Sequence, residues 1–169
     1  RKKGPLIHHI TNQVVMNFSA NGLLAFGGSP IMAKEPKEVS EIVDVADGLL
    51  LNIGTAVEND YKSMLTAGKR ANEKGFPIVL DPVGVGVSEF RREYIRQLLK
   101  EVSPTVIKGN AAEIAYLAEV NWEAKGVDAT GSGNVVDVAQ GAFEKYGCPI
   151  VLTGQQDVIV TSKGTQIND

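Results

Sequence analysis

The stretch PIVLDPVG, residues 77–84, decides the fold class. It is a short apolar run that ends in an acidic residue, a proline and a glycine, which is typical of a buried strand followed by a turn. Comparable apolar runs recur at residues 30–32, 49–53, 105–107, 149–152 and 157–161. Continuous apolar strands of this kind predict a mostly parallel sheet whose strands are buried on both faces.

Segments with helical periodicity lie between these runs, at residues 12–26, 36–46, 58–74, 89–101, 110–118 and 135–146. In the first of them, apolar residues such as Val14, Phe18 and Phe26 recur at the spacing of an amphipathic helix, which Thr11 or Asn12 would cap. Strands that alternate with helices require crossover connections. The sequence therefore predicts a single α/β domain over residues 1–169, a three-layer α/β/α arrangement with a mostly parallel sheet.

Composition excludes several classes of protein. The chain has 169 residues, of which 43% are hydrophobic and 22% charged, and its net charge is -3. That balance is ordinary for a globular protein and argues against a general nucleic-acid binder. A single cysteine excludes an intramolecular disulfide framework and a cysteine-rich zinc site. No apolar run is long enough to span a bilayer, and polar residues follow the basic N-terminus too soon for a signal peptide, so we expect a cytoplasmic protein without a membrane partner.

Polar side chains follow the predicted strands, at the sheet edge where open parallel sheets bind ligands. Asp81 follows one strand, Lys108 and Asn110 follow another, and Glu113 comes one helical turn later. Two carboxylates, those of Asp81 and Glu113, are suitable ligands for Mg²⁺. The Lys108 ammonium suits a polyphosphate, and Thr153 follows a further strand at the same edge.

Each of these residues also has a purely structural interpretation. Asp81 would cap the turn at Pro82, and Glu113 would complete a capping box with Asn110. Lys108 would then be a solvated lysine at a strand end. These alternatives stay open at the level of the residues alone.

Other motifs carry less chemistry. A P-loop is absent, and the Gly-x-Gly pairs at residues 84–86 and 131–133 do not open a dinucleotide-binding fingerprint. The adjacent His8 and His9 are interpreted as surface or turn structure rather than a metal site. Cys148 enters a predicted strand, where a free cysteine behaves as a small buried hydrophobe.

Several stretches together resemble one family. They are residues 5–12 (PLIHHITN), 20–25, 28–33, 51–55, 80–84, 109–114, 125–128 and 152–154, in family order through essentially the whole chain. The combination resembles the hydroxyethylthiazole kinases of the thiamin pathway. The resemblance implies a ribokinase-like fold and transfer of the ATP γ-phosphoryl group to the hydroxyl of 4-methyl-5-(2-hydroxyethyl)thiazole, with Mg²⁺ as the metal.

The same resemblance assigns expected roles to individual residues. Asn12 and Met32 match segments of the thiazole pocket, and Asp81 and Glu113 match acids near the metal and triphosphate. The positions expected to bind nucleotide are Lys108, Asn110 and Thr153, with Lys108 standing where the family more often has arginine. Lysine keeps the charge but loses bidentate phosphate geometry. The family's assembly implies a homotrimer whose thiazole site lies at a subunit interface.

One family feature has no counterpart in these residues. The family's anion hole is a Gly-x-Gly-Cys turn at a helix start, whose N–H groups stabilise the transferring phosphoryl group. The chain stops at Asp169 before such a turn, so we expect the catalytic turn beyond Asp169, a longer parent protein, and no activity for the chain by itself. Residues 128–134 superficially resemble the Gly-Ala-Gly-Asp anion hole of sugar kinases, but Asn134 replaces the catalytic acid and the segment comes too early in the topology.

Two other functions remain as alternatives. One is a related ribokinase-like kinase that acts on a pyrimidine or a sugar alcohol. The other is a non-catalytic module that binds a nucleotide or the thiazole. A Gly-x-Gly-Cys turn after Asp169 would favour the thiazole kinase, whereas a natural stop codon there would favour the binding module.

Overall fold

A computed structural model describes residues 4–120 and 132–169, and in these residues one eight-stranded sheet organises the chain. The strand order is β2-β1-β3-β4-β5-β6-β7-β8, with β1 to β6 parallel and β7 and β8 antiparallel. The strands are β1 (Leu6–Ile10), β2 (Ser29–Ile31), β3 (Gly48–Asn52), β4 (Ile78–Asp81), β5 (Val106–Asn110), β6 (Ile150–Thr153), β7 (Asp157–Thr161) and β8 (Gly164–Asn168). The predicted α/β class with a mostly parallel sheet is confirmed.

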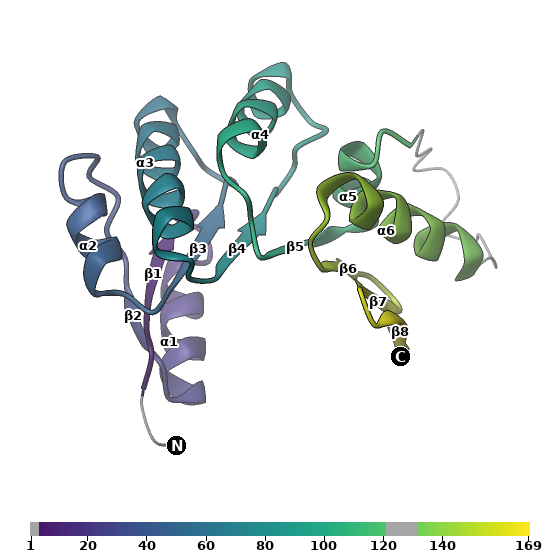
Figure 1. The fold of residues 1–169 in the computed structure, drawn as a ribbon, viewed down its shortest axis with the longest axis horizontal. Coiled ribbons are helices and arrows are strands. Elements are labelled where there is room, and N and C mark those ends of the chain that lie inside the picture. Colours follow the sequence, from purple (N-terminus) through teal and green to yellow (C-terminus); the bar gives the residue numbers. More distant parts are fainter. Residues whose placement is uncertain (1–3, 121–131) are drawn as a thin grey trace.

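The helices lie unevenly on the two faces of the sheet. They are α1 (Met16–Phe26), α2 (Val39–Val45), α3 (Glu58–Lys74), α4 (Glu89–Glu101), α5 (Ala111–Leu117) and α6 (Ser132–Tyr146). Figure 1 shows α2 to α6 on one face, whereas α1 lies on the other face beside β1 and β2. The bounds of α3 and α4 are those predicted from the sequence. None of the helices in the described ranges combines the length and apolarity that a membrane span needs.

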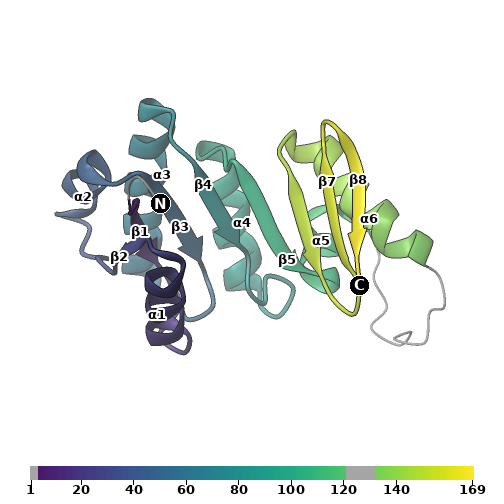
Figure 2. The ribbon, with the colours of Figure 1, turned by 90° about the horizontal axis from the view of Figure 1, so that it is seen from below.

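The core lies between the sheet and the larger helical layer, and burial alternates along the strands. In β4, Ile78 and Leu80 are 0% and 1% exposed, whereas Val79 and Asp81 are partly exposed. The same alternation runs through β6 and β7. Figure 2 shows the opposite face of the sheet, on which α1 lies. In the described part of the chain, α1 does not extend over β4 to β8 on that face. The prediction that the strands are buried on both faces is therefore wrong here, because an all-apolar run does not reveal which alternate residues a helix covers.

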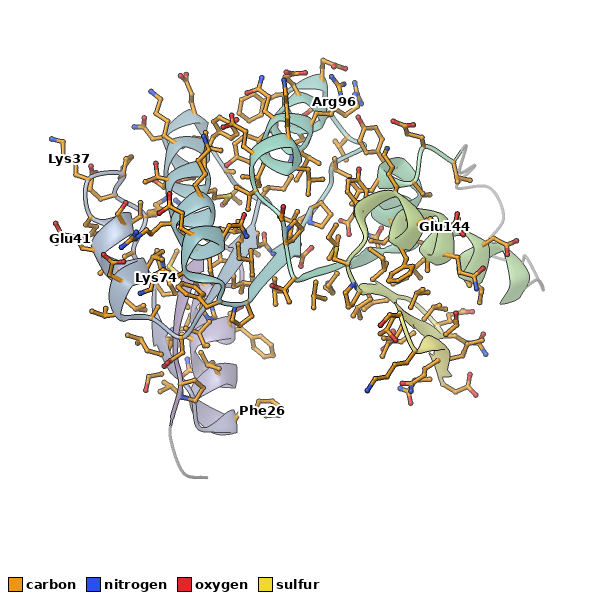
Figure 3. All side chains as sticks on the ribbon, viewed as in Figure 1. Phe26, Lys37, Glu41, Lys74, Arg96 and Glu144 are labelled. Carbon is orange, nitrogen blue, oxygen red and sulfur yellow. The ribbon has the colours of Figure 1, made fainter. Side chains whose placement is uncertain are left out.

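Helix α1 also differs from the prediction. It begins at Met16 rather than at residue 12, because residues 13–15 form a turn in which Asn12 Oδ1 accepts a hydrogen bond from the Val15 N–H at 3.0 Å. None of its residues is buried, and Phe18 and Phe26 are 81% and 83% exposed. Figure 3 shows Phe26 projecting away from the end of α1. The expected apolar face thus exists, and its side chains Phe18 and Phe26 are exposed in the described structure.

The sequence analysis did not predict two strands, β1 and β8, and β1 contains the histidine pair. His8 and His9 lie in β1 at 0% and 6% exposure, so their interpretation as surface or turn residues is wrong. His8 Nε2 is hydrogen-bonded to the Ala33 carbonyl at 2.7 Å, and burial lowers the pKa of both imidazoles. Polar residues in the middle of β1 hide the apolar-run pattern. Cys148 is a free, buried cysteine, as predicted.

Candidate functional site

The carboxyl ends of four neighbouring strands are joined by a row of hydrogen-bonded side chains. Asn12, just after β1, donates through Nδ2 to Asn52 Oδ1 at the end of β3, at 2.8 Å. Asn52 Nδ2 donates to Asp81 Oδ2 at the end of β4, at 3.3 Å. Lys108 Nζ of β5 approaches the same Asp81 oxygen at 3.3 Å. The parallel order β1-β3-β4-β5 brings these ends together, as the sequence predicted for Asp81 and Lys108.

A pocket of about 370 Å³ opens at the β1–β3–β4 part of this row. Its lining residues are Asn12, Val14, Val15, Asn52, Gly54, Thr55, Asp81 and Val83. Gly54 is needed where it stands, because a Cβ atom there would lie 2.9 Å from Asn12 Nδ2. The Gly54 N–H also donates to Asn52 Oδ1 at 3.0 Å, so the pocket wall is built from amide contacts. A mixture of apolar and neutral polar groups suits a small, mostly uncharged ligand.

Asp81 is the acidic end of this pocket. Its side chain is 14% exposed, and its Oδ1 is buried without a hydrogen-bond partner among the described residues. Burial raises the pKa of Asp81; the Lys108 charge opposes that rise and the Glu113 charge adds to it. A buried carboxylate oxygen without a partner is costly, and such atoms call for a functional explanation. The alternative that Asp81 merely caps the turn at Pro82 does not account for its bonds to Asn52 and Lys108.

Glu113 lies in the first turn of α5, and both of its carboxylate oxygens accept backbone N–H groups. Oε2 accepts from Asn110 at 2.8 Å, and Asn110 Oδ1 accepts from the Glu113 N–H at 2.9 Å, which completes the capping box considered from the sequence. Oε1 accepts from the Gly84 N–H at 2.8 Å. The carboxylate therefore also fixes the loop that follows β4, close enough to Asp81 for the two charges to interact.

The predicted nucleotide side of the site lies at the ends of β5 and β6. Asn110 and Thr153 pair in register across these strands. Thr153 Oγ1 donates to the Gly109 carbonyl at 3.4 Å, and the Lys108 side chain is 42% exposed. Among these three residues, Asn110 is exposed and Lys108 and Thr153 are partly exposed.

Not every predicted position meets at the pocket. Met32 follows β2, on the far side of β1, and does not belong to the pocket lining. Gly131 of the 131–133 turn, and the matching segment at residues 125–128, lie outside the described residues.

Two residues were missed in the sequence. Asn52 links Asn12 to Asp81, and its position after an apolar strand and two residues before a glycine was the available signal. Arg91 of α4 donates to carbonyl groups of the loops after β3 and β4, at Ile53, Gly54 and Val83. A helical arginine in an otherwise charged helix carries no such signal.

The residues present fit a divalent cation only in combination with a ligand. The described part of the chain brings no three His, Cys, Asp or Glu side chains into one metal-binding group. Asp81, with its unpartnered Oδ1, and the nearby Glu113 supply two carboxylates. Mg²⁺ is commonly held by one or two carboxylates together with substrate phosphates, so this donor set suits it.

Comparisons with known proteins identify the family. The model of the hydroxyethylthiazole kinase family matches residues 1–168. Hydroxyethylthiazole kinase 1 of Oceanobacillus iheyensis is 56% identical over 159 residues, which cover 94% of this chain and 62% of that protein. Hydroxyethylthiazole kinase of Haemophilus influenzae strain PittEE is 50% identical over 167 residues, which cover 98% of this chain and 63% of that protein. The chain therefore spans about three-fifths of the length of the curated relatives it matches.

Solved structures point the same way. The hydroxyethylthiazole kinase protein from Pyrococcus horikoshii superposes with a TM-score of 0.84 at 38% identity, covering 94% of this chain and 59% of that one. A ribokinase-like superfamily protein from Enterococcus faecalis, at 14% identity, has a TM-score of 0.61 over 97% of this chain and 62% of its own, which shows the shared fold alone. With the family model covering nearly every residue and relatives at half identity or better, the chain belongs to the hydroxyethylthiazole kinase family.

Proposed function

We propose that the protein containing this chain transfers the γ-phosphoryl group of ATP to the hydroxyl of 4-methyl-5-(2-hydroxyethyl)thiazole. The observation that carries the proposal is the row Asn12–Asn52–Asp81–Lys108, which joins a neutral pocket to an acid and a cation at one sheet edge. A small heterocyclic alcohol suits the neutral end, and a polyphosphate suits the charged end. Relatives that carry the name hydroxyethylthiazole kinase support the same reaction.

Each group of residues has a distinct part in this proposal. Asn12 shapes the thiazole pocket, and the resemblance implies a further part in thiazole binding for Met32, which lies outside the lining of this pocket. Lys108, Asn110 and Thr153 receive the nucleotide. The ammonium of Lys108 neutralises phosphate charge as a point charge, since it lacks the bidentate geometry of an arginine.

Asp81 and Glu113 would hold Mg²⁺ together with phosphate oxygens, and the cation would neutralise charge on the phosphates. Asp81 Oδ1, which has no hydrogen-bond partner among the described residues, would be a ligand oxygen for the cation. Glu113 orients the loop after β4 by accepting the Gly84 N–H. Phosphoryl transfer depends mainly on positioning and on stabilising spreading negative charge. The Gly-x-Gly-Cys turn that the resemblance implies for the family would supply the remaining N–H donors.

The proposal includes assembly and location. A homotrimer would cover the exposed apolar side chains of α1, among them Phe18 and Phe26, next to the pocket residues Val14 and Val15. Contiguous exposed apolar surface of this kind is typical of interfaces. We place the enzyme in the cytoplasm, as the sequence analysis predicts.

The test is an ATP-dependent phosphorylation assay on the complete gene product, with the thiazole alcohol, a hydroxymethylpyrimidine and a sugar alcohol as competing acceptors. We expect turnover on the thiazole alcohol alone. Glu113→Gln should lower kcat far more than thiazole affinity, because contacts to metal and phosphate matter most as charge redistributes in the transition state. Glu119→Gln is the matched control, since Glu119 pairs with Lys145 away from this edge.

Preference for another acceptor would replace the thiazole in the proposal. Unchanged turnover of Glu113→Gln at saturating Mg²⁺ and ATP would reduce Glu113 to a helix cap. A complete gene product that binds but does not phosphorylate any of the three acceptors would favour the binding-module alternative.

A further inference from the structure

Arg91 joins the two loops that follow β3 and β4. It lies in the first turn of α4, where its own N–H donates to the capping Ser88 Oγ at 3.3 Å. Its Nη1 donates to the Val83 carbonyl at 2.6 Å and approaches the Ile53 carbonyl at 3.4 Å. Its Nη2 donates to the Gly54 carbonyl. One half-buried guanidinium thus contacts three carbonyl groups on two separate loops.

Each of these loops leads directly into the proposed site. Gly54 forms the pocket wall against Asn12 and donates its N–H to Asn52 Oδ1. Val83 also lines the pocket, and the next residue, Gly84, donates its N–H to Glu113 Oε1 at 2.8 Å. Through Arg91 the wall of the substrate pocket and the loop that holds Glu113 share one fixed point.

The chemistry of this contact requires a guanidinium. Its planar fork can satisfy several carbonyl acceptors at once, whereas the ammonium of a lysine is a point donor on a flexible stem. In the described ranges no carboxylate lies within ion-pair distance of Arg91, so its partners are backbone oxygens. Gly84 makes room for the guanidinium, because a Cβ there would lie 3.2 Å from Arg91 Nη1. The φ of Gly84 is +65°, which also favours glycine at this position.

We infer that Arg91 is a positioning residue that holds the thiazole-pocket loop and the Glu113-binding loop in one productive arrangement. The inference rests on the proposed function and deepens it. Arg91 does not touch the reacting atoms; it sets the distance between the acceptor pocket and the carboxylates. A misplacement of about 1 Å between reacting groups can cost on the order of 100-fold in rate, so this distance matters.

The experiment compares Arg91→Ala and Arg91→Lys with Arg96→Ala in the complete gene product. Arg96 is the matched control, because it is an exposed arginine of the same helix (Figure 3). Its ion pairs are with Glu89 and Glu93. We expect Arg91→Ala to raise the KM for the thiazole alcohol and lower kcat, each by on the order of tenfold. Arg91→Lys should recover little, and guanidinium added well below unfolding concentrations should restore part of the activity of Arg91→Ala. Arg96→Ala should match the unaltered enzyme.

Amide hydrogen exchange separates this inference from the proposed function. Exchange at the Gly54 and Gly84 N–H groups should quicken in both Arg91 variants, whichever acceptor the enzyme uses. If the unaltered protein is inactive on the thiazole but exchange quickens in the variants, the proposed function is overturned and the positioning role of Arg91 stands. Unchanged amide exchange, or unchanged KM and kcat, in the Arg91 variants would overturn the inference. So would a loss of activity that only follows the loss of thermal stability and does not respond to guanidinium.

Discussion

On the pocket side of the site, buried amide side chains bond each other, whereas the polar side chains on the side formed by β5 and β6 are partly or fully exposed. Asn12 and Asn52 are buried and share a 2.8 Å hydrogen bond, with the Gly54 N–H as a third partner. Lys108 and Thr153, by contrast, are partly exposed. Asp81 lies between the two sides and keeps one buried oxygen without a partner among the described residues.

The difference indicates that the two sides meet their ligands in different ways. The amide-bonded side is arranged in advance, which lowers the ordering cost of binding a small neutral molecule. The other side carries the partly exposed ammonium of Lys108, whose charge suits a polyphosphate. Substitutions on the pocket side should therefore change stability and acceptor KM, whereas substitutions on the charged side should change turnover or nucleotide KM.

Asp81→Asn should give the largest effect. In the proposed function this carboxylate is one of two charged ligands for the metal, and we expect kcat to fall by on the order of 100-fold or more, comparable to the loss of one electrostatic stabiliser in other enzymes. The measurement is steady-state kinetics at saturating Mg²⁺. Asp47→Asn, at the opposite end of β3, is the control and should keep full activity. Equal losses in both variants would show that Asp81 acts only through folding.

The same variant sharpens the comparison through its pH dependence. Because burial raises the pKa of Asp81, the folded protein holds this proton at pH values where the unfolded chain has released it. The ionised side chain therefore costs stability, and that cost appears as the pH rises through the raised pKa. At neutral pH, Asp81→Asn should melt at a higher temperature than the unaltered protein, and the gap should close in acid. A lower Tm at neutral pH would contradict this.

Asn52→Leu should give the next largest effect. It leaves Asn12 Nδ2 and the Gly54 N–H without their acceptor, and unpaired buried donors cost about 1–3 kcal/mol. Urea unfolding should show that loss, and the thiazole KM should rise. Asn72→Leu is the control, because Asn72 bonds Ser103 between α3 and the end of α4 and should affect stability alone. An unchanged thiazole KM in Asn52→Leu would contradict the expectation that substitutions on the pocket side change acceptor KM.

Lys108→Arg should give the smallest effect. A guanidinium can contact a phosphate through two parallel N–H donors, which an ammonium cannot, and we expect the ATP KM to fall about threefold. Lys100→Arg, on the exposed side of α4, should leave the ATP KM unchanged. A higher ATP KM in Lys108→Arg would show that the ion pair with Asp81 sets the position of the ammonium.

The sequence predicted those parts of the fold that local patterns determine. The helix at residues 58–74 and the Asn110–Glu113 capping box follow from nearest neighbours, and both are confirmed. The strand at Leu6–Ile10 was missed because its histidines are buried by distant elements. Burial of a polar residue is decided by tertiary packing, which short-range periodicity does not contain.

The site divides in the same way. Asp81 and Lys108 could be predicted, since both follow apolar strands and parallel strand ends meet at one edge. Asn52 was not predicted as a site residue, because its link to Asn12 depends on the pairing of β1 with β3. Arg91 could not be predicted, because its role depends on two loops that α4 approaches only in the folded structure.

The order of the strands also bears on how the chain forms during synthesis. Strand β3 pairs with β1, and each strand from β4 to β8 then pairs with the strand before it in the chain. Neighbours in sequence become neighbours in space, which keeps loop closure inexpensive and favours folding as the chain leaves the ribosome. At every stage the growing edge of the sheet is unpaired, as is β2 at the opposite edge, and an unpaired edge is a template for wrong pairing with other chains. The risk of aggregation should therefore move along the sheet as translation proceeds, from β3 towards β8.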